Sequence, residues 1–234
     1  MGKYEIESLR NIQLFSSLSD EELRLVSDKL VLKRFRKNEI ILQEEDTNEY
    51  MYIILDGKVK VIQTTEDGKE ILLAIHQSGD SFGEMSLIDG KTSPATVLAT
   101  ENSAAAIVSK KDFYFILETQ KKVLNNLLLL LCSRHRESWE KIQMLNYKNA
   151  GHRVKILFLM LSDKYGEKTP EGITLNIKLT HQEMAEMTGM TRETVTRVID
   201  KWQRDGEIRV LKNKFIHLSM SFLTEGFKSP NQSF

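Results

Sequence analysis

The sequence predicts an α+β chain: an antiparallel β-barrel domain, then a long helix, then a small helical domain that ends in a β-hairpin. Three observations predict this order. Glycines recur at a regular spacing among short β-rich runs, leucines then follow a heptad pattern, and a tight turn later separates two amphipathic segments. We expect the barrel over residues 1–111, the long helix over 112–147 and the C-terminal domain over 148–234.

Composition limits the classes of protein that fit. The chain has 234 residues, 41% of them hydrophobic, which suffices for two buried cores. Its longest apolar run, Leu127–Leu131, is far shorter than the roughly 20 residues that cross a bilayer, so we expect a cytoplasmic protein with no membrane segment. No catalytic triad order, nucleotide-hydrolysis loop or metal-ligand cluster stands out, so we expect neither an enzyme nor a metal site.

The single cysteine, Cys132, excludes an internal disulfide and a four-cysteine iron–sulfur cluster or zinc site within one chain. Because it follows a run of leucines, we interpret it as a buried, inert thiol, with an oxidation sensor as the alternative.

The net charge of zero hides an asymmetry. Residues 1–147 carry a charge of −4 and residues 148–234 a charge of +4. A positive domain suits a phosphate-bearing partner, although many domains with neutral partners reach this value.

The β domain is predicted from its turns. Glycines occur eleven residues apart, at Gly57, Gly68, Gly79 and Gly90. The pairs Asp56-Gly57 and Asp67-Gly68 are typical of hairpin turns. β-rich runs such as 52–55 and 59–62 lie between them, which indicates an antiparallel sandwich or barrel. Before the first β-rich run, Ser19 is predicted to cap a short helix. This helix packs through Leu23, Val26 and Leu30.

From about Asp112 the apolar pattern acquires a heptad repeat, which predicts a helix that pairs in parallel with a copy of itself. Additional leucines at 127, 129 and 130 favour packing within the chain. We expect both kinds of packing. One side of the helix covers the β domain, and the heptad seam on the other side packs against a second chain. The seam comprises Leu124, Leu128, Leu131, His135, Ser138, Ile142 and Leu145.

A polar stretch over 146–151 follows, which we interpret as a hinge, and a buried helix comes after it. Residues 165–172 have the composition of a loop.

The next segment has the pattern of a helix-turn-helix. Thr180 and Glu183 fit a capping box at the start of one helix, Gly189 supplies a turn with positive φ, and Thr191 can cap the second helix. Ala185 is small, as the crossing of two helices requires. The turn therefore has the length and residue types of a DNA-binding motif.

The second helix presents two faces. Val195, Val198, Ile199 and Trp202 form the apolar one, and the other bears charged and hydroxyl side chains near the helix N-terminus. Arginine pairs with guanine edges and a carboxylate accepts from cytosine, so this face suits the major groove.

Glu193 and Arg197 could instead form a solvated pair four residues apart, but the surrounding pattern favours base reading. Lysines in a following hairpin wing can contact phosphate. The predicted DNA-binding residues are Thr180, Thr191, Arg192, Glu193, Thr196, Arg197, Lys212 and Lys214.

These residues resemble the cyclic-AMP receptor protein/FNR family of transcription regulators over nearly the whole chain. The segment 191–197 is similar to the recognition helix of the cyclic-AMP receptor branch. The resemblance implies a jelly-roll domain like those that bind cyclic nucleotides, a homodimer, and a palindrome of TGTGA-like half-sites. It also implies that Arg192 and Arg197 contact guanines and Glu193 a cytosine, and, by analogy, that RNA polymerase is contacted through the 163–172 region.

The stretch 82–96 also resembles the phosphate-binding cassette of that family, a glycine turn leading into a short helix. In cyclic-nucleotide binders the positions of Gly83 and Glu84 hold the phosphate and a ribose hydroxyl. Those proteins carry Arg-Ser where this chain has Ser93-Pro94. Losing a charge-assisted bond to phosphate lowers affinity by about one to two decades. We therefore predict that cyclic AMP does not control this protein and that its effector pocket is degenerate. The predicted pocket residues are Gly83, Glu84, Met85, Ser86, Ser93, Pro94, Ser138 and Trp139.

The family implies two alternatives: a cyclic-nucleotide-gated regulator, and a nucleotide-binding module that acts on a protein partner. Cysteine count excludes the FNR-type cluster. His76 and His135 leave haem open as a cofactor, although a structural role fits both better.

Overall fold

The computed structural model describes residues 9–68 and 70–224 and divides into two units, residues 1–133 and 134–234, with the division inside one long helix. The first eight and last ten residues of the expected domains lie outside the described residues. Over the described ranges, no helix combines the length and the hydrophobicity needed to cross a membrane.

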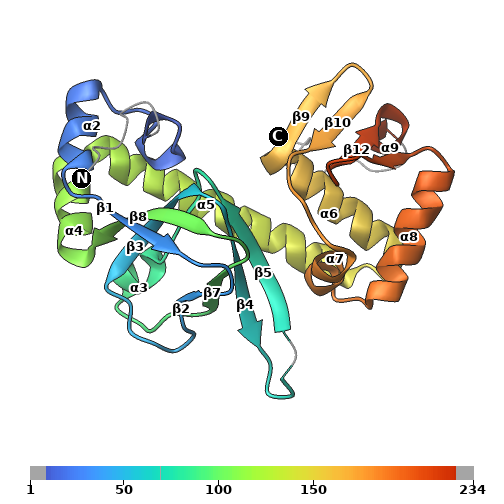
Figure 1. Cartoon of the computed structure of the whole chain (residues 1–234), viewed down its shortest axis with the longest axis horizontal. Coiled ribbons are helices and arrows are strands. Elements are labelled where there is room, and N and C mark those ends of the chain that lie inside the picture. Colours follow the sequence, from blue (N-terminus) through green and yellow to red (C-terminus); the bar gives the residue numbers. More distant parts are fainter. Residues whose placement is uncertain (1–8, 69, 225–234) are drawn as a thin grey trace. The chain divides into compact units, whose positions relative to one another are not determined.

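The first unit contains two four-stranded antiparallel sheets (Figure 1). One has the order β1 (Val31–Phe35), β8 (Ser103–Ser109), β3 (Tyr50–Asp56), β6 (Ser81–Phe82). The other has the order β2 (Ile40–Leu42), β7 (Thr96–Ala99), β4 (Lys58–Thr64), β5 (Glu70–Gln77). The domain is thus the antiparallel, jelly-roll-like domain that we expected, and within the described residues no ladder joins its two sheets into a closed barrel.

Alternation along β3 produces two cores. Tyr52 and Ile54 point into the core between the sheets, whereas Met51 and Ile53 point to the opposite face and pack in a second core with the helices. The glycines predicted to be in turns all have positive φ, at Gly57, Gly68, Gly79 and Gly90. Of these four glycines, only Gly68 lies in a hairpin, between the paired strands 58–64 and 70–77. Gly57 and Gly79 connect strands of different sheets, so Asp56-Gly57 is not the hairpin turn that we expected, and Gly90 ends the short helix 84–89.

Helices cover the outer core of this unit: η1 (Gln13–Phe15), α2 (Asp20–Ser27), α3 (Glu84–Asp89), α4 (Lys110–Thr119) and the beginning of α5 (Lys121–Asn146). Ser19 caps α2 in a capping box, as predicted. The helical stretch expected over 112–147 is two helices, because Gln120 leaves the helical conformation. This break lets Phe113 in α4 and Val123 in α5 join one core.

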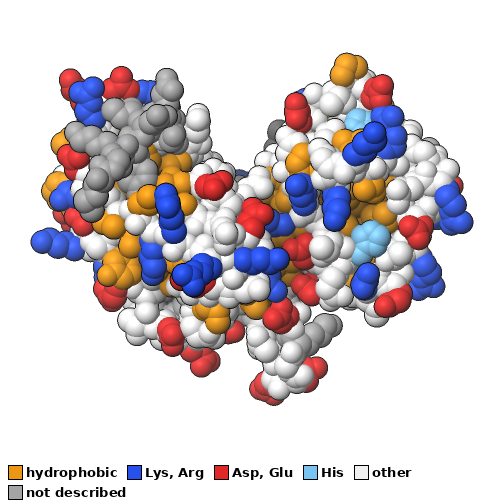
Figure 2. All heavy atoms as spheres, viewed as in Figure 1, with side chains coloured by type: hydrophobic (Ala, Val, Ile, Leu, Met, Phe, Trp, Pro, Cys, Tyr) orange, Lys and Arg blue, Asp and Glu red, His pale blue; other side chains and the backbone are white. Residues whose placement is uncertain are grey.

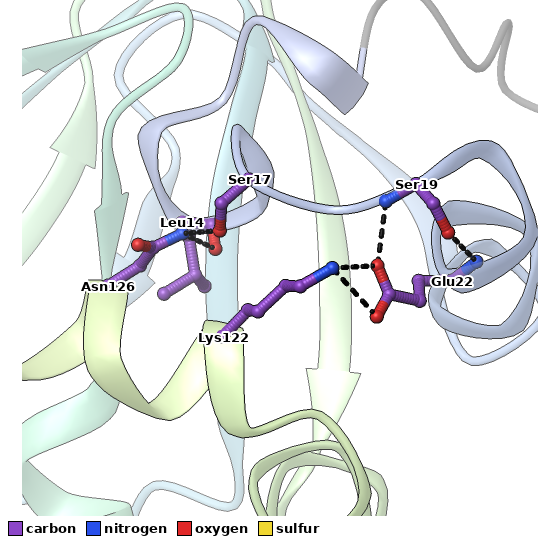
Figure 3. A network of polar contacts seen from close by, with 6 residues as sticks. All are labelled: Leu14, Ser17, Ser19, Glu22, Lys122 and Asn126. Carbon is purple, nitrogen blue, oxygen red and sulfur yellow. Dashed lines mark hydrogen bonds and ion pairs between the residues drawn. The ribbon is translucent and has the colours of Figure 1, made fainter.

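Polar contacts fasten α5 to the segment before it (Figure 3). Lys122 Nζ donates to both carboxylate oxygens of Glu22 at 3.1 and 2.8 Å, and Asn126 Nδ2 donates to the carbonyl of Leu14 at 3.0 Å and to Ser17 Oγ at 2.9 Å. The bond from Lys122 is the main cause that lowers the pKa of Glu22, followed by the bond from the Ser19 backbone N–H.

The second unit consists of the end of α5 followed by helices and one four-stranded sheet of order β11-β12-β10-β9. Its elements are α6 (Ala150–Tyr165), β9 (Gly166–Thr169), β10 (Gly172–Leu175), α7 (His181–Thr188), α8 (Arg192–Arg204), β11 (Ile208–Val210), β12 (Ile216–Ser219) and α9 (Met220–Thr224). Aromatic rings of Phe158, Trp202 and Phe222 meet in its core, with centroids 5.1 to 6.1 Å apart.

Two sequence predictions fail here. Residues 165–172 are not a loop, because β9 and β10 pair as a hairpin and β10 also pairs with β12 of the wing. Gly172 permits this approach: a Cβ on it would lie 1.9 Å from the carbonyl oxygen of Leu218. The expected six-residue hinge is also shorter, since only Tyr147, Lys148 and Asn149 separate α5 from α6.

Candidate DNA interface and effector segment

The turn between α7 and α8 has the predicted geometry. Thr180 and Glu183 form the capping box: Glu183 N–H donates to Thr180 Oγ1 at 3.1 Å, and Thr180 N–H donates to Glu183 Oε2 at 2.7 Å. Gly189 has φ +63°, and its N–H donates to the carbonyl of Ala185. Thr191 caps α8 by accepting from Thr194 N–H at 3.2 Å. Both helices of the motif therefore begin on a satisfied cap.

Helix α8 buries one face and exposes the other. Val195, Ile199 and Trp202 are buried, and Val198 is only half-buried. Arg192 and Glu193 are exposed at the N-terminal end of α8. These two charged side chains contribute nothing to the core and are accessible to a ligand.

Arg197 is also exposed, and its guanidinium donates to Thr194 Oγ1 at 3.3 Å. In the described part of the chain, no ion pair joins Glu193 to Arg197. The local pair that offered a structural explanation for these residues is therefore absent.

Thr196, also predicted to bind DNA, differs from the three predicted base readers. It is half-buried, and its Oγ1 is hydrogen-bonded to His181 Nδ1 at 2.8 Å. His181 was not among the residues predicted to bind DNA. It follows the capping Thr180 directly, and that position at the start of α7 is the signal that could have identified it.

The wing forms as predicted. The hairpin between β11 and β12 is closed by Leu211 N–H donating to the carbonyl of Phe215 and by Lys214 N–H donating to the carbonyl of Leu211, both at 2.8 Å. Lys212 and Lys214 are exposed on it. An ion pair between Arg209 and Glu171 links the wing to the β9–β10 turn and lowers the pKa of Glu171. Figure 2 shows lysine and arginine side chains spread over the visible face of this unit.

The predicted seam on α5 is largely exposed. Leu128 and Ile142 are 54% and 60% exposed, and Leu131 is half-buried; the other seam residues, Leu124, His135, Ser138 and Leu145, are exposed. Leu127, by contrast, is buried in the core of the first unit. Helix α5 therefore has the two sides that the sequence indicated. Cys132 is exposed, so its interpretation as a buried thiol is wrong.

In the first unit, the cassette is a glycine turn that leads into a short helix, as the sequence predicted. Gly83 has φ +86°, and a Cβ on it would lie 2.8 Å from the carbonyl oxygen of Tyr50. Asn48 fastens the turn by donating to the carbonyls of Tyr50 at 2.7 Å and Gly83 at 2.8 Å. Glu84 is buried, Met85 is exposed and Ser86 is buried in the short helix that follows.

The positions that depart from the family pattern are occupied by local bonds. Ser93 is buried, and its Oγ donates to the carbonyl of Ala95 at 2.8 Å, while its N–H donates to the carbonyl of Asp46. The carbonyl of Pro94 accepts from Gln63 Nε2 at 2.8 Å. Neither residue supplies a cation or a free N–H for a phosphate.

Two predicted pocket residues lie in the second unit. Ser138 Oγ donates to the carbonyl of Arg134 along α5 at 2.9 Å. Trp139 is 58% exposed, and its ring lies 4.5 Å from that of His135.

The histidines considered for haem have local contacts. His76 is buried with its ring parallel to that of Phe82 and lies 3.7 Å from Asp80. The ring of His135 contacts that of Trp139 at an interplanar angle of 59°. Over residues 9–68 and 70–224, no group of three or more His, Cys, Asp or Glu side chains could hold a metal ion.

An N-terminal β-sandwich, a long helix and a winged helix-turn-helix together define the architecture of a DNA-binding protein with a separate β domain. Residues 32–120 match the model of the cyclic nucleotide-binding domain, and residues 152–225 match that of the Crp-like helix-turn-helix domain.

Curated relatives agree with these matches. The chain is 30% identical over 186 residues to a global nitrogen regulator of Synechocystis, covering 79% of this chain and 83% of the relative. It is 28% identical over 202 residues to a cyclic AMP receptor protein of Thermus thermophilus, covering 86% and 90%. The fold matches a CooA variant of Carboxydothermus hydrogenoformans with a TM-score of 0.72 at 22% identity, covering 88% and 90%. The chain belongs to the cyclic-AMP receptor protein/FNR family and is a DNA-binding transcription regulator.

Proposed function

We propose that this regulator acts as a homodimer on a palindrome of TGTGA-like half-sites and that cyclic AMP does not control it. In this proposal residues 1–111 form the sensor domain, 112–147 the dimerisation region and 148–234 the DNA-binding domain of a cytoplasmic protein that contacts RNA polymerase. The single observation that carries the proposal is the exposed, capped N-terminal turn of α8, where Arg192 and Glu193 are accessible in a segment similar to the family's recognition helix.

The base contacts follow from side-chain chemistry. Arg192 and Arg197 each offer a planar fork that matches the O6 and N7 acceptors of guanine, and Glu193 accepts from cytosine N4. The proposed phosphate contacts come from Thr180, Thr191, Lys212 and Lys214, and the exposure of all four side chains supports this assignment. Thr196 acts through its bond to His181, so these two side chains approach DNA as a pair.

The homodimer is supported by the exposed apolar side chains along α5. Seam residues such as Leu128 and Ile142 are more than half exposed, although a helix surface in water favours polar side chains. In the proposed dimer, the seam of one chain packs against the seam of a second copy. The two recognition helices can then bind one DNA whose half-sites lie about 34 Å apart.

The RNA polymerase contact rests on analogy with the family and on the exposed β9–β10 hairpin. Polar side chains such as Glu167 and Lys168 project from this edge of the sheet.

Independence from cyclic AMP is supported by Ser93 and Pro94. Ser93 is buried and bonded to the backbone of its own unit, and Pro94 has no N–H to donate. The alternative, a cyclic-nucleotide-gated regulator, is favoured by the retained turn at Gly83 and the buried carboxyl group of Glu84. We place it second because neither residue replaces the missing arginine.

Binding of the ligand-free full chain to a TGTGA palindrome tests the DNA-binding proposal. We expect sequence-selective, salt-sensitive binding by fluorescence anisotropy, with a scrambled palindrome as the control. Equal binding to both DNAs would contradict the predicted operator.

Calorimetric titration with cyclic AMP tests the effector proposal. We expect no binding at micromolar concentrations and no change in operator affinity when the nucleotide is added. A micromolar dissociation constant would support the gated alternative.

A further inference from the structure

The short link between α5 and α6 is bridged by one arginine. Arg153, in the first turn of α6, donates from Nε to the carbonyl of Tyr147 in the link at 2.7 Å. From Nη1 it donates to the carbonyl of Thr188, at the end of α7, at 3.2 Å. One guanidinium therefore joins the link to the residue that precedes the turn of the helix-turn-helix.

Both acceptors favour a cation. Thr188 is the last residue of α7, where backbone carbonyls lack helical partners and carry the negative end of the helix dipole. Tyr147 follows the last residue of α5 directly, and its N–H donates to the carbonyl of Met144 at 3.2 Å. Arg153 thus satisfies carbonyls at the C-terminal ends of two helices.

Packing brings the same parts together. A Cβ on Gly189 would lie 3.3 Å from Leu145 Cδ2 and 3.8 Å from Arg153 Nη1. The turn of the helix-turn-helix therefore rests on the last turn of α5, and the lack of a side chain at Gly189 permits this close approach. On the other side of the link, Asn149 caps α6 by accepting from His152 N–H at 3.1 Å.

We propose that Arg153 is a positioning residue that fixes the turn of the helix-turn-helix on the C-terminal end of α5. The link 147–149 is then a clamped joint and not the pivot that its polar sequence suggests. The recognition helix α8 and the C-terminal end of α5 then move as one body. The position of α5 therefore sets the separation of the two recognition helices in a dimer. This inference rests on the proposed function, because it concerns how two reading helices are spaced.

The side chain has to be arginine for this role. Its planar fork carries five N–H donors in fixed directions, so it reaches two carbonyls at once. Lysine keeps the charge but not the fork, and glutamine keeps neither the charge nor the reach. Arg153→Lys and Arg153→Gln therefore separate geometry from charge.

The experiment compares three DNAs for the full chain: the palindrome, the palindrome with one base pair inserted at its centre, and a single half-site. One inserted base pair moves a half-site by about 3.4 Å and turns it by about 34° around the DNA axis. The wild type should discriminate strongly against the insertion.

We expect Arg153→Gln to weaken binding to the palindrome about tenfold while changing half-site binding less than about twofold, because only the paired contacts depend on spacing. The inserted base pair should lower the affinity of Arg153→Gln less than it lowers that of the wild type. Arg153→Lys should behave similarly. Arg204→Gln, which removes an exposed charge at the other end of α8, should leave the ratio of palindrome to half-site affinity unchanged. Equal losses on the palindrome and on the half-site, or no loss on either, would overturn the inference.

Hydrogen exchange gives a readout that does not depend on the operator. In Arg153→Gln, amides of 145–149 and 187–191 should exchange faster, while those of α8 should stay protected as in a folded domain. Unchanged exchange in both segments would overturn the clamp. If the wild type binds neither the palindrome nor the half-site but the exchange result holds, the proposed function fails and the clamp stands.

Discussion

Two glycine turns, each leading into a helix, can be compared directly. Gly83 precedes α3 with φ +86°, and Gly189 precedes α8 with φ +63°. After Gly83 the next side chain, Glu84, is buried. After Gly189 and the capping Thr191, the side chains of Arg192 and Glu193 are exposed.

The difference concerns what keeps each turn in place. At Gly83, Asn48 holds the backbone by donating to the carbonyls of Tyr50 and Gly83, and the Tyr50 carbonyl leaves no room for a Cβ. The charged residues of α8, in contrast, make no contribution to the core. A preserved cassette backbone is therefore weak support for a ligand, whereas exposed charges on a capped helix support a partner.

The largest expected effect tests the claim about Gly83. Gly83→Ala should lower the free energy of unfolding by about 3 kcal/mol, because it combines positive φ with a steric clash. Gly68→Ala is the matched control: it has φ +77° but nothing within 4 Å, so about 1 kcal/mol is expected. Urea unfolding measures both. Equal losses would mean that the packing around Gly83 does not determine this turn.

The second prediction concerns the exposed side of the comparison. Arg192→Ala should cost about 2 kcal/mol of operator binding and relax selectivity at one base pair, with no change in unfolding. Anisotropy with operators substituted at each position measures this, and Arg204→Ala serves as the control. A loss that is the same on every sequence would assign Arg192 to phosphate.

The third prediction concerns cyclic AMP binding by the cassette. Ser93→Arg combined with Pro94→Ser should raise cyclic AMP affinity about tenfold or more, because it supplies a charge-assisted bond and an N–H donor. Calorimetry measures the affinity, and Gly68→Ala, which leaves 93–94 untouched, is the control. If affinity does not rise, other changes in the cassette also disfavour the nucleotide.

The smallest effect concerns the polar network that fastens α5 in the first unit. Because Lys122 lowers the pKa of Glu22, the stabilisation is present at neutral pH and is lost as pH falls below about 4. Lys122→Met should therefore narrow the difference in stability between pH 7 and pH 3. Urea unfolding at both values measures it, and an unchanged difference would show that this exposed pair contributes nothing.

Local signals predicted much of the fold. Ser19, Thr180 and Thr191 were identified as caps, and Gly189 as the turn, because each depends on atoms only a few residues away. The wing hairpin also follows from local pattern.

Features that depend on distant partners were not predictable in this way. Residues 165–172 have a loop-like composition, but pairing with β12 holds β10 in a sheet. The helix breaks at Gln120 because α4 and α5 both contribute side chains to one core. The bonds of Thr196 to His181 and of Arg153 to Thr188 likewise join residues 15 and 35 positions apart. No single-segment pattern encodes such contacts.

The contact of Leu145 with the turn at Gly189 has a consequence for how such regulators diversify. A recombination event that exchanged sensor domains at the polar link would separate the reading head from the helix end on which it rests. A crossover within α5, upstream of Leu145, would carry the head and its support together. The inherited module for DNA recognition is then longer than the winged helix by at least one turn of α5.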